Sequence, residues 1–150
     1  KIGEPLGTAI GNANTSLVES QYGWNSLTDF HDNAQSILNV YTGKLGYRSS
    51  TDTVTPSMNG LYALVAAHDP VLASRVLEEI LDAQRKIALI KGDGDSSTTA
   101  ITGGAKPFRT QISDATGRTL IEAAVAALAT LKNTLQTQVA PLVGTTTFAG

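Results

Sequence analysis

Apolar side chains recur every three or four residues within the stretch Glu19–Gly43, and this period constrains the fold more than any other feature. At about 100° per residue they share one stripe of an α-helix. The stripe consists of Leu27, Phe30, Ala34, Ile37, Leu38 and Tyr41. The pattern predicts a helix over Leu27–Thr42 with this stripe in the core. Asn25 or Ser26 is expected as its N-cap, and Gly43 as its stop.

Two later stretches repeat the helical period. One follows Asp69-Pro70, a cap and first-turn proline, and the other spans Gly117–Ala140 and is expected to end before Pro141. Their apolar positions are Leu72, Val76, Ile80, Ala83, Ile87 and Ile90 in the first, and Ile121, Ala124, Leu128, Leu131, Leu135 and Val139 in the second. A short helix is expected over Met58–His68 and a helical turn over 107–113. With no cleanly alternating strand, the sequence predicts an all-α protein, an antiparallel helical bundle.

The remaining segments are predicted to be irregular and to lie before and between the helices. Residues 1–20 are rich in Gly, Asn and Thr without a sustained period, and we expect an extended lead-in. Residues 92–107 are rich in Gly, Ser and Thr, which is typical of a flexible loop. Asp93 and Asp95 lie in that loop without the further oxygen ligands of a calcium site, so we interpret them as solvated. Residues 1–150 are expected to form a single domain.

Charge and composition exclude several function classes. Charged residues make up 16% of the chain and the net charge is -2, which does not favour binding to nucleic acid or to an anionic membrane surface. No apolar run is long enough for a transmembrane segment. Cysteine is absent, and the two histidines, His31 and His68, match no zinc motif. We interpret His31 as a half-buried residue of a helix seam and His68 as a helix C-terminal residue, and we expect no catalytic residue and no metal ligand in this chain.

Polar side chains form a second stripe beside the apolar one. Ser26, Asp29 and Asn33 share one arc of the predicted helix, whereas Thr28, Asp32, Gln35 and Asn39 are expected on the solvated face. The first arc has three interpretations: a hydrogen-bond network between helices, a second solvated face, or one wall of a polar pocket. Trp24 and Tyr22 are adjacent and belong either to such a pocket or to the core.

A family resemblance follows from the residues of this region. The run Glu19-Ser20-Gln21-Tyr22-x-Trp24-Asn25-Ser26-Leu27-Thr28-Asp29-Phe30-x-Asp32-Asn33, continued by Ile37-x-Asn39-Val40-Tyr41-Thr42-Gly43, resembles the second half of the imelysin-like family, also called peptidase M75 or iron-regulated protein A-like. The segment Leu61-Tyr62-Ala63-Leu64-Val65-Ala66-Ala67-x-Asp69-Pro70-Val71-Leu72 and the turn Lys106-Pro107-Phe108 are similar to the same family. The resemblance spans nearly all of the chain.

The resemblance implies an all-α protein of two bundle-like halves, periplasmic or held at the cell surface as a lipoprotein, and often linked to iron acquisition. Family members have been described as metallopeptidases, and the motif credited with that activity, G-x-H-x-x-E, belongs to the first half. This sequence contains no copy of it. The resemblance therefore implies that these 150 residues are the C-terminal half of a larger protein, with Lys1 at a cut site.

Three functions remain open from the sequence. The leading one is a ligand-binding half, not catalytic alone, in which Glu19, Ser20, Trp24, Ser26, Asp29 and Asn33 line a polar cleft. Its expected partners are the N-terminal half or a companion chain and a small ligand, iron or haem, with iron or another divalent metal in the intact protein only. The second is a metallopeptidase whose His-x-x-Glu metal motif lies in the missing half. The third is a purely structural helical assembly module.

Overall fold

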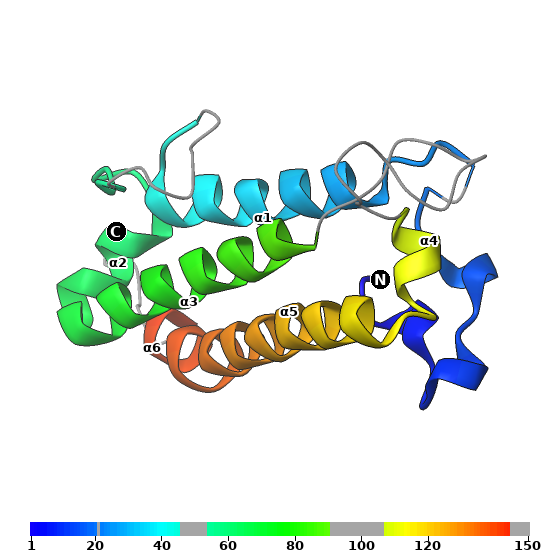
Figure 1. Cartoon of the computed structure of the whole chain (residues 1–150). Coiled ribbons are helices and arrows are strands. Elements are labelled where there is room, and N and C mark those ends of the chain that lie inside the picture. The colour runs from blue at the N-terminus through cyan, green and yellow to red at the C-terminus, as the bar shows by residue number, and fades with distance from the viewer. Residues whose placement is uncertain (21, 46–53, 91–106, 145–150) are drawn as a thin grey trace. The chain divides into compact units, whose positions relative to one another are not determined.

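The computed structural model describes residues 1–20, 22–45, 54–90 and 107–144, and within these ranges it is all-α, without a strand (Figure 1). Three helices are long and three are short. The long ones are α1 (Ser26–Thr42), α3 (Pro70–Leu89) and α5 (Ala115–Thr134), and the short ones are α2 (Leu61–His68), α4 (Phe108–Gln111) and α6 (Ala140–Gly144). The predicted fold class, an all-α helical bundle, is confirmed. In the described part of the chain, no helix has the length and apolar character needed to cross a membrane.

Aspartate caps set the starts of α3 and α5. The Asp69 carboxylate accepts the backbone N–H of Leu72 at 2.8 Å, with Pro70 as the first helical residue, as the sequence predicts. In the same way the Asp114 carboxylate accepts the backbone N–H of Gly117 at 2.9 Å. This second cap places the start of α5 at Ala115, two residues before the predicted Gly117.

Glycine ends α1 as predicted. Gly43 has φ 67°, the left-handed conformation that closes a helix at low cost, and its N–H bonds to the Asn39 carbonyl at 2.9 Å. Gly60, which precedes α2, lies against this turn, because a Cβ added to it would be 2.4 Å from the Gly43 nitrogen. The close approach of two backbones therefore requires glycine at position 60.

The last helix does not end before Pro141, so that prediction is wrong. After Thr134 the chain continues as a π-helix, η4 (Leu135–Val139), and then as α6, which contains Pro141. The N–H of Ala140 bonds to the Leu135 carbonyl, five residues back. Pro141 is the second residue of α6, in the first turn after this change of register, where a missing N–H costs little.

The chain divides into two compact units, and the division falls inside α1, α3 and α5. Unit 1 consists of Lys1–Asn33 and Arg85–Ala126, and unit 2 consists of Ala34–Gln84 and Ala127–Gly150. Each unit is built from segments that are far apart in the sequence.

In unit 1 the lead-in folds onto the start of α5. Residues 1–20, predicted to be extended, contain three single turns of 3-10 helix: η1 (Glu4–Leu6), η2 (Ile10–Asn12) and η3 (Thr15–Leu17). The Arg118 side chain, 7% exposed, donates to the carbonyls of Leu6 at 2.6 Å and Ile112 at 2.9 Å. Buried carbonyls outside regular helix need partners, and this guanidinium supplies them. The loop predicted at 92–107 lies outside the described residues, except for Pro107.

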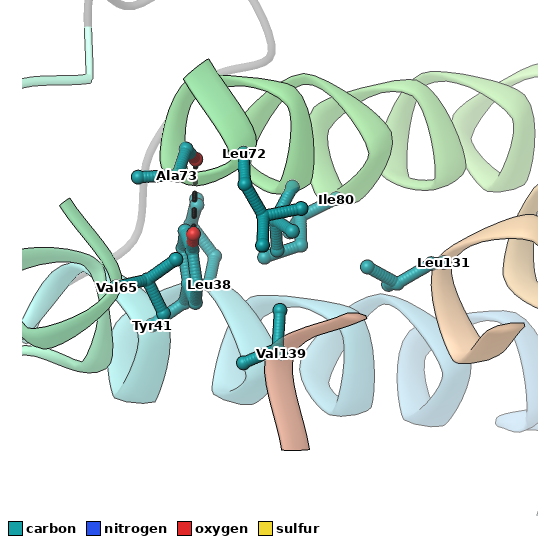
Figure 2. Close-up of a cluster of buried hydrophobic side chains, with 9 residues drawn as sticks. Leu38, Tyr41, Val65, Leu72, Ala73, Ile80, Leu131 and Val139 are labelled. Atoms are coloured by element: carbon teal, nitrogen blue, oxygen red, sulfur yellow. Dashed lines mark hydrogen bonds between the residues drawn. The ribbon is translucent and has the colours of Figure 1, made fainter. Parts of the chain in front are cut away.

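Unit 2 has an aliphatic core between its helices (Figure 2). The buried cluster consists of Leu38, Tyr41, Val65, Leu72, Ala73, Val76, Ile80, Leu131 and Val139. Two hydrogen bonds show that α1 and α3 are antiparallel: Tyr41 Oη donates to the Ala73 carbonyl at 2.9 Å, and Gln84 Nε2 donates to Gln35 Oε1 at 3.3 Å. The C-terminal end of α1 thus contacts the N-terminal end of α3, and an earlier part of α1 contacts a later part of α3. The prediction of antiparallel packing therefore holds for this pair.

Candidate functional site

A strained turn precedes α1 in unit 1. Ser20 and Trp24 have φ values of 54° and 53°, a region that side-chain-bearing residues, and bulky ones above all, rarely adopt. The Ser20 carbonyl accepts the N–H groups of Gly23 at 3.0 Å and Trp24 at 2.9 Å, which closes the turn. Such a conformation persists only where surrounding contacts hold it. The side chains of α1 supply those contacts.

Asp29 is the residue that ties the turn to the helix. The Ser20 hydroxyl donates to one of its carboxylate oxygens, Oδ2, and the Asn25 amide donates to the other, Oδ1, at 3.1 Å. The N–H of Asp29 in turn bonds to the Asn25 carbonyl at 3.0 Å, as the first bond of α1. A carboxylate in the first helical turn is also favoured by the helix dipole. Because its two oxygens accept hydrogen bonds from Ser20 and Asn25, Asp29 ties both ends of the turn to α1.

Ser26 fixes the other end of the same turn. Its hydroxyl, on a residue that is 2% exposed, donates to the backbone carbonyl of Glu19. The predicted polar arc therefore begins as an internal hydrogen-bond network at Ser26 and Asp29. Asn33, one turn later on α1, is exposed.

Glu19 stands apart within this network. Its carboxylate oxygen Oε2 is buried and has no hydrogen-bond partner among the described residues. Buried polar atoms in folded proteins are nearly always paired, and leaving one unpaired costs about 1–3 kcal/mol or more for a charged group. This oxygen is therefore an acceptor available to a cation or a hydrogen-bond donor.

Trp24 contributes an aromatic face to the site, and Arg109 adds a positive charge beside it. Its indole ring is half-buried, and the guanidinium carbon of Arg109, in α4, lies 5.0 Å from the ring centroid. This is cation–π geometry. Tyr22, beside it in the sequence, is 87% exposed and belongs to neither the core nor this contact. The Trp24 ring thus joins the turn to the Arg109 side chain of α4.

The structure brings five of the six predicted site residues into this turn and the first turn of α1. They are Glu19, Ser20, Trp24, Ser26 and Asp29. Sequence reasoning missed Arg109, which is separated from Trp24 by the three helices α1, α2 and α3 and for which no spacing signal exists. It assigned Asn25 to a capping role only, although the Asn25 amide also donates to Asp29.

Metal-ligating residues do not gather in groups within the described ranges. Among those residues, no three His, Cys, Asp or Glu side chains lie close enough to hold a metal ion together. His31 is half-buried on α1, and His68 is the last residue of α2, as the sequence predicts for both. Glu19 Oε2 would supply one oxygen ligand to a cation, and the other ligands would have to come from elsewhere.

Comparison with known proteins identifies the family. No curated protein and no solved structure is significantly similar to this chain. The family model described as imelysin, peptidase M75, matches residues 1–135, which include the turn at Ser20–Trp24, all three long helices and the Asp69-Pro70 cap. The match covers nine-tenths of the 150 residues. On this evidence the chain belongs to the imelysin family, peptidase M75.

Proposed function

We propose that this chain is the ligand-binding part of an extracytoplasmic imelysin protein linked to iron acquisition. In this proposal the turn at Glu19–Asn25, with Asp29 behind it, forms one wall of a polar cleft that faces an N-terminal half or a companion chain. Membership of the imelysin family supports the extracytoplasmic location and the link to iron.

The observation that carries the proposal is the buried Oε2 atom of Glu19, which has no hydrogen-bond partner in the part of the chain that the structure describes. A hydrogen-bonded turn with backbone strain at two positions holds it in place, and strained, over-determined segments of this kind cluster at binding sites. A carboxylate oxygen is a ligand for hard cations and an acceptor for N–H or O–H donors. We infer that it contacts an iron ion, or a chelator of iron, whose remaining ligands come from the facing half.

The two carboxylates of the site, Asp29 and Glu19, have different roles in this proposal. Asp29 holds the turn, so Asp29→Ala would release Ser20 and Asn25 and change binding through the loss of structure. Glu19→Gln keeps the size of the side chain but replaces one oxygen and the negative charge. Glu19→Gln is therefore the sharper variant for testing ligand contact.

The experiment is a titration of the intact protein, including any facing half, with iron(II) alone under anaerobic conditions and separately with ferric citrate. We expect Glu19→Gln to weaken binding of at least one probe about tenfold or more, which corresponds to about 1.4 kcal/mol. Glu78→Gln, at an exposed position of α3, is the matched control and should bind as the unmodified protein does. Equal affinities for Glu19→Gln and Glu78→Gln would refute the proposal.

The two other candidate functions predict different results for the same protein. A metallopeptidase would cleave peptides. Chelation of the metal would abolish this cleavage, and so would replacement of the metal-binding histidine in the other half. A structural assembly module would bind neither probe, and the face around Glu19 would be covered by protein.

A further inference from the structure

Unit 2 contains an apolar slot that the polar site does not use. Its volume is about 330 Å³, and its walls come from α1, α2, α3 and η4. The lining residues are Ser36, Ile37, Val40, Tyr41, Leu61, Ile80 and Leu135. Apart from the Ser36 hydroxyl and the Tyr41 phenol, the described side chains that line it are hydrocarbon. All of them belong to unit 2.

The floor of the slot is preformed. Tyr41 and Ile80 are each 2% exposed and belong to the buried cluster of unit 2 (Figure 2). The Tyr41 hydroxyl donates to the Ala73 carbonyl at 2.9 Å, so the polar atom of this side chain is already bonded to the backbone of α3. Its ring lines the slot. A ligand would therefore meet a fixed surface, and little ordering free energy would be lost on binding.

The rim of the slot is exposed. Val40 is 71% and Ile37 39% exposed, although Ile37 belongs to the apolar stripe that the sequence predicts to be buried. Leu135, which also lines the slot, is the first residue of the π-helix η4. Single π-helical turns within α-helices occur frequently at functional sites. The slot thus combines an accessible rim, a rigid floor and a π-helix among its lining elements, and these features are typical of a binding site.

The lining determines the chemistry of the occupant. No Asp, Glu, Lys, Arg or His is among the described residues that line the slot, so a charged group placed inside would lose its hydration without compensation. The volume is at the lower end of the range of about 300–1,000 Å³ seen for small-molecule sites. The seven residues that line the slot are also far fewer than the roughly 20–30 residues that each partner contributes to a stable protein complex. We propose that the slot binds the neutral alkyl chain of a small molecule.

The test is a titration of the chain with 1-hexanol, 1-heptanol and 1-octanol, followed by methyl NMR. We expect saturable shifts at the methyl groups of Ile37, Val40, Leu61, Ile80 and Leu135. Each added methylene should tighten binding about fourfold for as long as the slot has room for it, because burial of a methylene is worth about 0.8 kcal/mol. Shifts that are absent, or that do not saturate, would overturn the proposal.

Two valine variants separate slot binding from general surface adsorption. Val40→Lys places a charge on the rim and should weaken 1-octanol binding at least tenfold. Val71→Lys is the matched control, since Val71 is 77% exposed in the same unit and does not line the slot. Both positions are exposed, so both variants should retain the helical signal and unfolding midpoint of the unmodified chain. Equal effects of the two variants would also overturn the proposal.

A different occupant would be recognised in parallel. Sedimentation that shows self-association, lost in Val40→Lys and suppressed by 1-octanol, would assign the slot to a contact between two copies of the chain and refute a small-molecule site. Glu19→Gln should leave 1-octanol binding unchanged, because Glu19 belongs to unit 1. Failure of the iron titration and failure of the alcohol titration are therefore independent results.

Discussion

Replacing Tyr41 with phenylalanine tests the central hydrogen bond of unit 2. Tyr41 is 2% exposed, and its hydroxyl donates to the Ala73 carbonyl at 2.9 Å. The substitution removes this bond and leaves the ring in place, so at pH 8 we expect the free energy of unfolding to fall by about 1 kcal/mol. Urea denaturation followed by circular dichroism measures that difference.

The same substitution has an opposite effect at alkaline pH. Burial, with smaller effects of the nearby Tyr62 and Glu79, raises the pKa of Tyr41 well above its ordinary value near 10. Above pH 10 the unfolded chain therefore releases this proton while the folded chain keeps it, and the stability of the unmodified protein falls as pH rises, by up to about 1.4 kcal/mol per pH unit. Tyr41→Phe lacks this loss, so the two stabilities should become equal near pH ~10.7 and then reverse.

Only the Tyr41 phenol differs between the two proteins. Tyr22→Phe, at an exposed position, is the control and should change neither the stability at pH 8 nor its decline at high pH. Stability curves of Tyr41→Phe and the unmodified protein that stay parallel up to pH 11.5 would show that the fold does not keep the Tyr41 phenol neutral. The reasoning about its burial would then be refuted.

Two further substitutions test contacts that depend on a single residue. Arg118→Met keeps the length of the side chain but removes the donors to the Leu6 and Ile112 carbonyls, and we expect urea denaturation to show a loss of about 2–3 kcal/mol. A loss below about 0.5 kcal/mol would mean that water replaces the guanidinium. Gly60→Ala places a Cβ 2.4 Å from backbone atoms and should cost about 1–3 kcal/mol, whereas Gly144→Ala, with no atom within 4 Å of the new Cβ, should change stability by less than about 0.5 kcal/mol. Equal unfolding midpoints for the two glycine variants would contradict the close backbone approach at position 60.

Local signals in the sequence were sufficient to predict the three long helices, although not every boundary. Asp69-Pro70 and Gly43 act through their own backbone and nearest neighbours, so the start of α3 and the end of α1 are legible without tertiary information. The prediction that the last helix ends before Pro141 was wrong, because proline breaks a helix only where the α-helical hydrogen-bond register continues through it. The π-helix before it changes that register, and no local pattern in Leu135–Val139 announces it.

The faces of α1 were predicted only in part. The period gives the angle between side chains, but it does not show which neighbouring segment covers each angle. Ile37 therefore lies at an exposed slot rim, and Gln35, expected on the solvated face, is half-buried and accepts a hydrogen bond from Gln84.

The candidate site was predictable where it is local. Glu19, Ser20, Trp24, Ser26 and Asp29 lie within eleven consecutive positions, so their proximity follows from one turn and one helix start. Arg109 reaches Trp24 through tertiary packing, which a single sequence does not encode legibly.

The bond between Arg118 and the Leu6 carbonyl joins residues that are 112 positions apart. At a synthesis rate of roughly 5–20 residues per second, Leu6 would be added to the chain about 6–22 seconds before Arg118. Loop closure over such a separation is also among the slow events of folding. The segment around Leu6 is therefore made well before the side chain that holds it, and it remains accessible to proteases and chaperones until the start of α5 is made.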